Sequence, residues 1–440
     1  MEPREKKEKR ERQMQYCVKT IEGFQKGEYD TRLKDVYVDE RFVEKQKLRY
    51  IRAMKQYVQF FSDGEVGVFS APGRTEVCGN HTDHQHGKIL AAPIHLDVLA
   101  VAGVNGGDTV EFVSEGYDKI TISIADLEMR EEEVGQTAGL VRGVLKGLKD
   151  RGYAVGGFNA YTTSDVLIGS GLSSSAAFEN AVGAIVSGLF NDNAIDAVTL
   201  AQVSQFAENV YFKKPCGLMD QMASAVGGFI YVDFQNPVSP SVEKLEVDFE
   251  KHGYSICIVD TKGSHVDLTD DYASIPLEMK KVAGYFHKEV LRDCNEEEVY
   301  AQLAKLREVA GDRAVLRAIH FFREERNVEN AVQALQNGDI NTFLSIIKAS
   351  GNSSFQYLQN VYTTRDVHSQ NVSVALAYSE TLLSGGYGVC RVHGGGFAGT
   401  IQAFVKNEFV ETYKTAIESV FGEGACHVLK IRKYGSIAVL

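Results

Sequence analysis

Two glycine-rich loops and an aspartate among apolar residues constrain this chain most, because each is costly to fold unless it serves a site. The loops read GSGLSSSAA at 169–177 and HGGGFAGT at 393–400, and Asp220 lies within GLMDQMAS at 217–224. Glycine lets a backbone approach a ligand closely, and free N–H groups at a helix start or in a glycine turn attract phosphate. A carboxylate between apolar neighbours is costly to bury unless it is paired. Together the segments indicate phosphoryl transfer to a small molecule.

Each of these segments also has a plain structural explanation when it is taken alone. Ser173, Ser174 and Ser175 could cap the helix that begins there, and Asp220 could cap a short helix of its own. The GGG run could form a wide hairpin turn or a bulge. The serine loop is not a Walker A loop, because no lysine follows its last glycine, and its spacing does not fit a dinucleotide-binding fingerprint.

A fourth segment, APGRTEVCGNHTDHQHG at 71–87, is unusually dense in polar groups. Arg74 follows a Pro-Gly turn, from which its guanidinium could neutralise a transferring phosphoryl group and keep Asp220 ionised. The three histidines lack the HExxH spacing and an evident fourth ligand, so the pattern does not favour zinc. Glu208 lies on a helix whose other face is apolar, and it is either a surface charge or an inward-facing metal ligand.

Composition argues against several classes of protein. The 440 residues carry a net charge of −12, which disfavours a nucleic-acid-binding surface. No apolar run approaches the roughly 20 residues that a membrane span requires, and the N-terminus MEPREKKEKRER is charged throughout, unlike a signal peptide. The seven cysteines are scattered without a CxxC pair, which favours reduced thiols and a cytoplasmic location.

Hydrophobic patterning predicts an α+β fold rather than a doubly wound one, because helices and strands do not alternate strictly. Helical spacing dominates residues 13–62 and 272–385. Short β-branched runs predict strands at 66–71, 88–94, 96–103, 109–115, 119–125, 158–164, 227–234, 254–261, 387–406 and 427–440. Further helices are expected at 140–148, 175–190 and 200–212. The stretch 234–249, which carries two of the prolines, is the best candidate for a domain boundary.

Taken together, the segments resemble in order and form the motifs of the GHMP family of small-molecule kinases, and most closely those of galactokinases. APGR-x₄-GNHTDH-x₂-G resembles the signature APGR-x₄-GEHTDY-x₂-G, LIGSGLSSSAA the motif PxGxGLSSSAA, and PCGLMDQ the galactokinase PCGIMDQ. GGGFAGT resembles the third family motif, and SHVDLTDDY at 264–272 resembles a stretch that ends in a sugar-contacting tyrosine. The resemblance covers roughly residues 66–440.

This resemblance implies a role for each matching residue. Asp220 and Arg74 would be the catalytic pair: the carboxylate orients or deprotonates the anomeric hydroxyl, and the guanidinium stabilises the developing charge. The ATP phosphates would be held by Gly169, Ser170, Gly171, Leu172, Ser173, Ser174, Ser175 and Ala176, with Ser175 and Glu208 on Mg²⁺. The sugar hydroxyls would be read by Asn80, His81, Asp83, Gly217 and Tyr272.

The resemblance also implies a fold and a domain organisation. The expected architecture is a two-domain α+β GHMP kinase fold, with a ribosomal-protein-S5-domain-2-like N-terminal domain, a ferredoxin-like C-terminal domain and the active site in the cleft between them. Residues 1–45 would form a helical extension, 46–245 the first domain and 246–440 the second. We expect a monomer, with a homodimer as the alternative, and no nucleic-acid or membrane partner.

Departures from the galactokinase pattern leave the exact sugar open. The signature Glu, which contacts the C6 side of the sugar, is Asn80, and an uncharged residue there would tolerate a C6 carboxylate. The signature Tyr is His84, the Asn two positions after the family Arg is Glu76, and the Pro that opens the second motif is Leu167.

We expect galactose as the substrate, with galacturonate or arabinose as alternatives. A regulator that senses galactose and ATP without turnover is a second alternative, although the complete run Ser173–Ala177 favours an enzyme. A kinase for a non-sugar alcohol such as mevalonate is a third, and the GNHTDH and PCGLMDQ segments argue against it.

Overall fold

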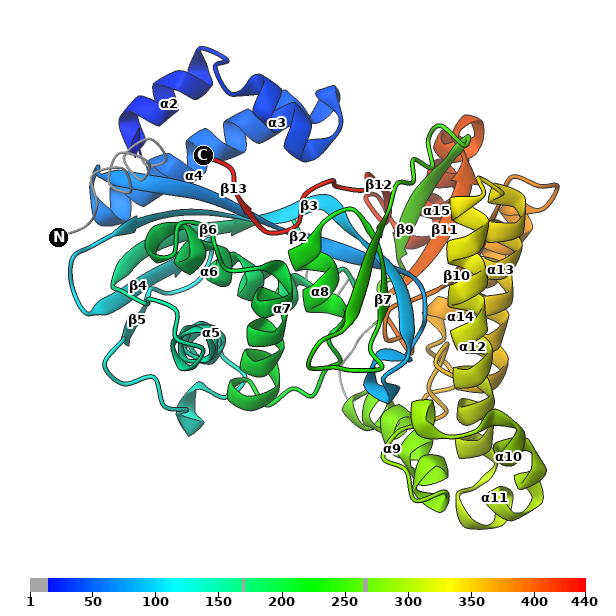
Figure 1. Cartoon of the computed structure of the whole chain (residues 1–440). Coiled ribbons are helices and arrows are strands. Elements are labelled where there is room, and N and C mark those ends of the chain that lie inside the picture. Colours follow the sequence, from blue (N-terminus) through cyan, green and yellow to red (C-terminus); the bar gives the residue numbers. More distant parts are fainter. Residues whose placement is uncertain (1–14, 168–170, 264–267) are drawn as a thin grey trace.

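Two sheets, one mixed and one antiparallel, each with its own helices, make up the protein (Figure 1). The structure is a computed structural model that describes residues 15–167, 171–263 and 268–440. Apolar residues from both halves of the chain share one core between the sheets, so the halves pack against each other. In the described ranges, no helix combines the length and the apolar character needed to cross a membrane.

The first sheet has nine strands. They are β1 (Gln15–Tyr16), β2 (Glu65–Cys78), β3 (Lys88–Val104), β4 (Thr109–Ser114), β5 (Ile120–Ser123), β6 (Phe158–Ser164), β7 (Phe229–Asp233), β8 (Ser241–Leu245) and β13 (Ile437–Ala438). Their order is β1-β2-β3-β6-β4-β5, with β13 beside β2, β7 beside β3 and β8 beside β7. The pair β4–β6 is parallel and the other pairs are antiparallel.

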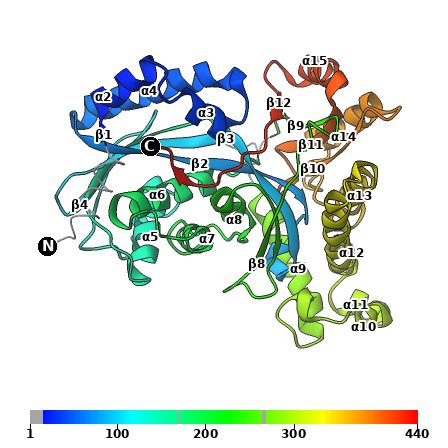
Figure 2. The same cartoon turned by 45° about the horizontal axis from the view of Figure 1, so that its top comes forward.

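Helices cover both faces of this sheet (Figure 2). One face carries α2 (Cys17–Gln25), α3 (Asp30–Tyr37), the short η1 (Glu40–Phe42) and α4 (Val43–Phe61). The other face carries α5 (Thr137–Asp150), α6 (Ser174–Phe190), α7 (Ala197–Phe206) and α8 (Met219–Val226), with η3 (Glu131–Glu133) before α5 and the π-helical turn η4 (Ala207–Tyr211) continuing α7. Apolar residues recur at helical spacing in α4 and α5, which gives each helix a buried face.

The second sheet has four strands in the order β10-β11-β9-β12. These are β9 (Tyr254–Asp260), β10 (Gly388–His393), β11 (Thr400–Lys406) and β12 (Cys426–Leu429), all paired antiparallel. Its associated helices are α9 (Thr269–Tyr285), η5 (Leu291–Asp293), α10 (Glu296–Ala301), α11 (Leu303–Val309), α12 (Asp312–Gln336), α13 (Ile340–Ser353), η6 (Ser354–Leu358), α14 (Asn371–Leu383), η7 (Asn407–Phe409) and α15 (Val410–Phe421). α14 and α15 pack on one face, and α12 and α13 pack on the other.

The α+β class is confirmed, and most differences from the predicted elements concern length. The two strands expected at 88–94 and 96–103 form the single long strand β3. The helical region expected over 13–62 consists of the three helices α2, α3 and α4, with left-handed residues Gly27 and Val38 between them. The domain division at residue 45 falls inside α4, and the C-terminal strand returns to the first sheet, where Ile437 pairs with Ser70.

The bend in β2 positions the candidate site. The ladder between β2 and β3 shifts register between Pro72 and Arg74 and again between Glu76 and Cys78. Such bulges re-aim side chains and bend the strand. Arg74 and Glu76, charged residues in an otherwise apolar strand, are therefore directed away from the first sheet's core toward other polar groups.

Asp97 of β3 ties three distant segments together. It is fully buried, and its Oδ1 accepts a hydrogen bond from Arg49 of α4 at 2.6 Å. Its Oδ2 accepts from Tyr37 of α3 at 2.8 Å and lies 3.2 Å from Arg432, near the C-terminus. The N-terminal helices are thus anchored to the sheet by buried charge as well as by apolar packing.

Removing the Asp97 carboxylate should destabilise the whole fold. Asp97→Ala leaves buried Arg432 without its counter-charge and leaves Arg49 only Asp165 at 3.4 Å, and breaking a buried pair in this way costs about 3–5 kcal/mol. Chemical denaturation would measure the loss, with the exposed Asp118→Ala as the matched control. Equal stability of the two variants would contradict the anchoring role.

Candidate active site

Arg74 and Asp220 form a charged pair where the first sheet meets α8. Arg74 is buried in β2, and Asp220 lies in the first turn of α8. The guanidinium Nε and Nη2 lie 2.8 and 2.7 Å from the carboxylate Oδ1. Nη1 donates to the carbonyl of Gly171, so the same arginine also holds the serine loop. The structure thus brings together three of the segments that the sequence singled out.

The environment of Asp220 keeps it ionised near neutral pH. Burial raises the pKa of this carboxyl, but the Arg74 cation and a hydrogen bond from the Ser173 hydroxyl outweigh burial, and the pKa lies below its usual value. Both carboxylate oxygens therefore have protein partners, Arg74 on Oδ1 and Ser173 on Oδ2. An ionised, oriented carboxylate of this kind can accept a hydrogen bond or a proton from a substrate hydroxyl.

The serine loop turns sharply before α6. Gly171 has a φ of +68° and Ser173 a φ of +57°, both in the left-handed region. A Cβ atom on Gly171 would lie 2.9 Å from the Thr400 hydroxyl and 3.4 Å from the ring of His393, which are at the two ends of the HGGGFAGT loop. Glycine at this position therefore lets the two glycine-rich loops approach each other.

Backbone contacts fix the loop against β2. The carbonyl of Leu172 accepts a hydrogen bond from the Arg74 amide at 3.1 Å, and Leu172 and Ala176 are buried. α6 begins at Ser174, and within the described residues no side chain caps its start. The amides of its first turn are thus suited to an anion. The predicted contacts of Gly169 and Ser170 lie outside the described residues.

Ser175 and Glu208 meet at the other side of this helix start. The Ser175 hydroxyl donates to Glu208 Oε1 at 3.1 Å, and Glu208 is buried in the π-helical turn η4. Gln221 donates to Oε2 at 2.7 Å, and Lys214 contacts Oε1 at 2.7 Å. A hydroxyl and a carboxylate are oxygen ligands that suit a hard cation such as Mg²⁺. The described residues contain no cluster of three or more His, Cys, Asp or Glu suited to a metal ion.

Asp83 lies against the segment that carries Asp220. It begins η2 (Asp83–Gln85), and its Oδ1 accepts from the His84 amide at 2.8 Å. A Cβ atom on Gly217 would lie 1.6 Å from Asp83 Oδ2, so only glycine fits there. Burial and the negative charge of Asp220 raise the pKa of Asp83 to about 6. Two carboxylates of one site thus have pKa values shifted in opposite directions.

His81 and Tyr272 both contact the HGGGFAGT loop. His81 is left-handed with a φ of +59°, and its Nε2 donates to the Gly395 carbonyl at 3.0 Å. Burial lowers the pKa of His81 to about 4, so the ring is neutral at pH 7. Tyr272 of α9 donates from its hydroxyl to the Gly396 carbonyl at 2.9 Å. Two of the predicted sugar-reading residues therefore also hold the second glycine loop.

Asn80 is buried in a polar network between the two halves of the chain. Its Nδ2 donates to Glu76 Oε2 at 3.1 Å and to the Gly394 carbonyl at 2.7 Å. Its Oδ1 accepts from Ser354 at 3.1 Å and from Asn360 at 2.9 Å. The whole amide is engaged by protein partners, so Asn80 would have to release one of them to contact a sugar.

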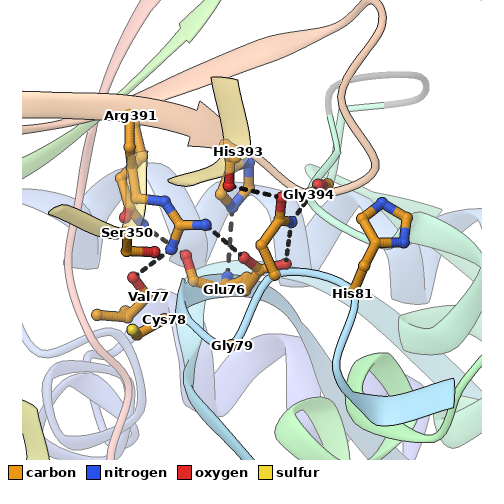
Figure 3. A network of polar contacts seen from close by, with 12 residues as sticks. Glu76, Val77, Cys78, Gly79, His81, Ser350, Arg391, His393 and Gly394 are labelled. Atoms are coloured by element: carbon orange, nitrogen blue, oxygen red, sulfur yellow. Dashed lines mark hydrogen bonds and ion pairs between the residues drawn. The ribbon is translucent and has the colours of Figure 1, made fainter. Parts of the chain in front are cut away.

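The same network contains a buried ion pair. Arg391 of β10 contacts Glu76 Oε1 at 2.9 Å and the Val77 carbonyl at 2.6 Å (Figure 3). Burial raises the pKa of Glu76, partly offset by Arg391. The guanidinium–carboxylate contact joins the second sheet to β2 of the first.

α12 holds the loop that follows β2. Glu324 accepts hydrogen bonds from the amides of Gly79 at 3.0 Å and Asn80 at 3.4 Å, and also from the Ser350 hydroxyl. His320 donates from Nε2 to the Asn80 carbonyl at 2.9 Å. Burial raises the pKa of Glu324, but His320 and Arg391 outweigh it and lower the pKa to about 2. Side chains from the second half of the chain thus fix the backbone conformation at the start of the GNHTDH segment.

Sequence reasoning missed this network, although part of it carried a signal. Glu76 and Arg391 are buried charges in strands composed mainly of apolar residues, a pattern that indicates paired groups. Glu324 and His320 lie in a helix rich in charged residues, where nothing distinguishes inward-facing from outward-facing groups. Their roles follow only from the packing of α12 against the β2 loop.

Comparisons with known proteins agree with the motifs. The family model for the GHMP kinases N terminal domain matches residues 139–228, and the model for the galactokinase galactose-binding signature matches residues 55–104. A galactokinase of Streptomyces coelicolor is 29% identical over 361 residues, which cover 81% of this chain and 88% of the relative. A galactokinase of Limosilactobacillus reuteri is 28% identical over 383 residues, covering 84% and 93%.

Solved structures share the fold. The Lactococcus lactis galactokinase complexed with galactose superposes with a TM-score of 0.75 at 24% identity, covering 87% of this chain and 98% of that one. A mevalonate kinase superposes with a TM-score of 0.57 at 13% identity, covering 83% of this chain and 99% of that one. The two-domain GHMP kinase fold expected from the motifs is thereby confirmed.

The network predicts that the effects of substitutions at positions 76 and 80 on stability are coupled. Asn80→Glu places a further buried carboxylate beside Glu76 and Glu324 and should cost about 3 kcal/mol of unfolding free energy. Glu76→Asn combined with Asn80→Glu keeps one acid and one amide and should recover a substantial part of the loss. Chemical denaturation of the two single variants and the double variant measures the coupling.

The exposed Asn341→Glu controls for the effect of an added charge. Full stability of the Asn80→Glu single variant, or strictly additive losses in the double variant, would contradict the coupling of these two positions.

Proposed function

We propose that this chain, a member of the GHMP small-molecule kinase family that is similar to galactokinases over most of its length, transfers phosphate from ATP to the anomeric hydroxyl of galactose. The products are the sugar 1-phosphate and ADP. The observation that carries this proposal is the contact of Asp220 with Arg74 and Ser173 where the serine loop meets α8. An ionised carboxylate beside a phosphate-binding helix start is what transfer to a hydroxyl requires.

In the proposed reaction Asp220 accepts a hydrogen bond from the sugar hydroxyl and orients its oxygen toward the γ-phosphorus. The new bond forms between that oxygen and phosphorus, the bond to the β-phosphate oxygen breaks, and the hydroxyl proton passes to the Asp220 carboxylate. Arg74 holds the carboxylate by two nitrogens and keeps its pKa low. Positioning and fixed charge supply most of the rate in such transfers.

The serine loop and α6 are proposed to bind the phosphates through backbone amides, with Ser174 and Ser173 at the helix start. Ser175 and Glu208 would hold Mg²⁺, which supplies charge neutralisation for the phosphates when it is bound. Their contact at 3.1 Å places a hydroxyl and a carboxylate oxygen side by side, a donor set that fits this ion.

Asp83 is the proposed reader of the sugar, with His81, Gly217 and Tyr272 around it. A carboxylate can accept hydrogen bonds from two adjacent hydroxyls, and an analogue that leaves it unpaired loses affinity. Asn80 keeps its proposed place near the C6 side, but its amide is engaged by Glu76 and Gly394. A contact of Asn80 with the C6 group of either galactose or galacturonate would require one of these hydrogen bonds to be released.

A coupled ADP-release assay with Mg·ATP tests the function. Among galactose, galacturonate, arabinose, glucose and N-acetylgalactosamine, galactose should give the highest kcat/KM. A kcat/KM for galacturonate at least tenfold higher than that for galactose would identify galacturonate as the substrate instead. Binding of ATP and galactose without turnover would establish the sensing alternative instead.

Asp220→Asn should lower kcat by about 10²–10⁴-fold, because the amide keeps the shape but cannot take the proton. ATP affinity, measured by calorimetry, should stay near that of the unaltered protein. The exposed Asp118→Asn is the matched control. A near-normal kcat for Asp220→Asn would refute the role of this residue.

The raised pKa of Asp83 predicts weaker sugar recognition in mild acid. Because the carboxylate is the hydrogen-bond acceptor, kcat/KM for the sugar should fall by about tenfold per pH unit below about 6 and level off above it. The folded pKa exceeds the unfolded one, so Asp83 favours the folded state as the pH falls through about 6. Protonation of Asp83 therefore does not destabilise the fold, and unfolding caused by it cannot account for the activity loss in mild acid. Asp83→Asn should weaken sugar binding and remove the inflection near pH 6 from the pH profile of kcat/KM. If the inflection persists in this variant, another titrating group causes it.

A further inference from the structure

Lys214 contacts the proposed metal ligand Glu208 through both its backbone and its side chain. The Lys214 amide donates to the Glu208 carbonyl at 3.1 Å, and the Nζ lies 2.7 Å from Glu208 Oε1. The preceding residue, Lys213, is left-handed with a φ of +58°, which turns the chain back at the end of η4. Glu208 is 2% exposed and the Lys214 side chain 60% exposed, so a buried acid is capped by a lysine that reaches in from solvent.

The ammonium group lies beside the proposed phosphate cradle. Glu208 Oε1, the oxygen that Lys214 contacts, also accepts from the hydroxyl of Ser175 in the first turn of α6. Gln221, the residue after Asp220, occupies the other oxygen of Glu208. Lys214 is therefore linked through Glu208 to the start of α6 on one side and to the segment of Asp220 on the other.

The distribution of cations in the site indicates a phosphate-binding role for Lys214. Arg74 is committed to Asp220 and to the Gly171 carbonyl, and it is buried, so it cannot follow a moving phosphate. Among the residues that the structure describes, Lys214 is the other cation in contact with a carboxylate of the proposed phosphate and metal site. A polyphosphate that enters a site rich in carboxylates needs positive charge close by.

We propose that Lys214 binds the phosphates of the nucleotide, and that Glu208 holds it in place when no nucleotide is bound. This inference rests on the proposed function, because it takes the serine loop as the phosphate cradle. A cation that binds Glu208 Oε1 displaces the ammonium from that oxygen, and the flexible stem of lysine lets the freed head turn to the triphosphate. Lys214 thus releases the Glu208 carboxylate and binds a phosphate instead. Arg74 cannot do the same, because it is buried and held by Asp220.

A purely structural role makes a different prediction. If Lys214 only neutralises buried Glu208, its loss should disturb the site equally for every nucleotide. If it binds phosphate, its loss should weaken binding more as phosphates are added to adenosine. Lys213 supplies a matched control, because it is adjacent in sequence and its Nζ pairs at 2.8 Å with Glu131 on the surface instead.

The test is calorimetric titration of adenosine, ADP and ATP in the presence of Mg²⁺ and without sugar. Lys214→Gln removes the charge but keeps a donor for Glu208, so the buried acid is not left unpaired. We expect its Kd for ATP to rise about tenfold or more, the loss typical of a charged hydrogen bond, with adenosine affinity within twofold of the unaltered protein. Lys214→Arg should retain part of the ATP affinity, and Lys213→Gln should behave like the unaltered protein.

Adenosine binding also reports whether each variant is folded. An ATP affinity of Lys214→Gln within twofold of that of Lys213→Gln would overturn the proposal, as would an equal loss for adenosine and ATP. Should Lys214→Gln fail to bind adenosine, Lys214→Arg decides: an ATP loss no greater than its adenosine loss overturns the proposal, and an ATP loss greater than its adenosine loss supports it. Failure of the proposed function would show differently, as absent sugar phosphorylation by the unaltered protein, and would leave this nucleotide series readable.

Discussion

The site depends on a loop that one half of the chain supplies and the other half holds. The GNHTDH segment leaves β2 of the first sheet, yet its backbone amides are bound by Glu324 and its carbonyl at Asn80 by His320, both from α12. Arg391 of β10 pairs with Glu76 beneath it. Buried charges are stable only with their partners in place, so this contact makes the position of Asp83 a property of both halves together.

The pKa values of two neighbouring carboxylates, Asp220 and Asp83, are shifted in opposite directions. Arg74 and Ser173 hold Asp220 ionised, whereas burial and the charge of Asp220 itself raise the pKa of Asp83. Pairs of acids whose environments separate their pKa values mark acid–base sites. Here the low-pKa group lies nearest the serine loop, and the raised one lies against Gly217, where no other residue would fit. At neutral pH both acids are therefore ionised, with Asp220 paired to Arg74 and Asp83 accepting a hydrogen bond from the His84 amide.

Motif reasoning was most successful where a residue's chemistry is local. Arg74 of β2 contacts Asp220 in the first turn of α8, and Ser175 in the first turn of α6 contacts Glu208 of η4. It was least informative for Asn80, whose side-chain amide is fully hydrogen-bonded by partners from β2, η6 and two loops, a set that no sequence spacing reveals. The helical division of residues 15–61 was also missed, since Val38 breaks the pattern with a backbone conformation that its residue type disfavours.

The sequence by itself indicated the α+β class, a resemblance to the GHMP kinases and the candidate residues, because hydrophobic periodicity and motifs are features of short segments. Only the tertiary structure decided which charges neutralise one another. Asp97 with Arg49 and Arg432, Glu76 with Arg391, and Lys214 with Glu208 join residues whose pairing depends on how sheets and helices pack. The energy of a charge pair depends on distance and burial, and neither quantity exists until the chain is folded.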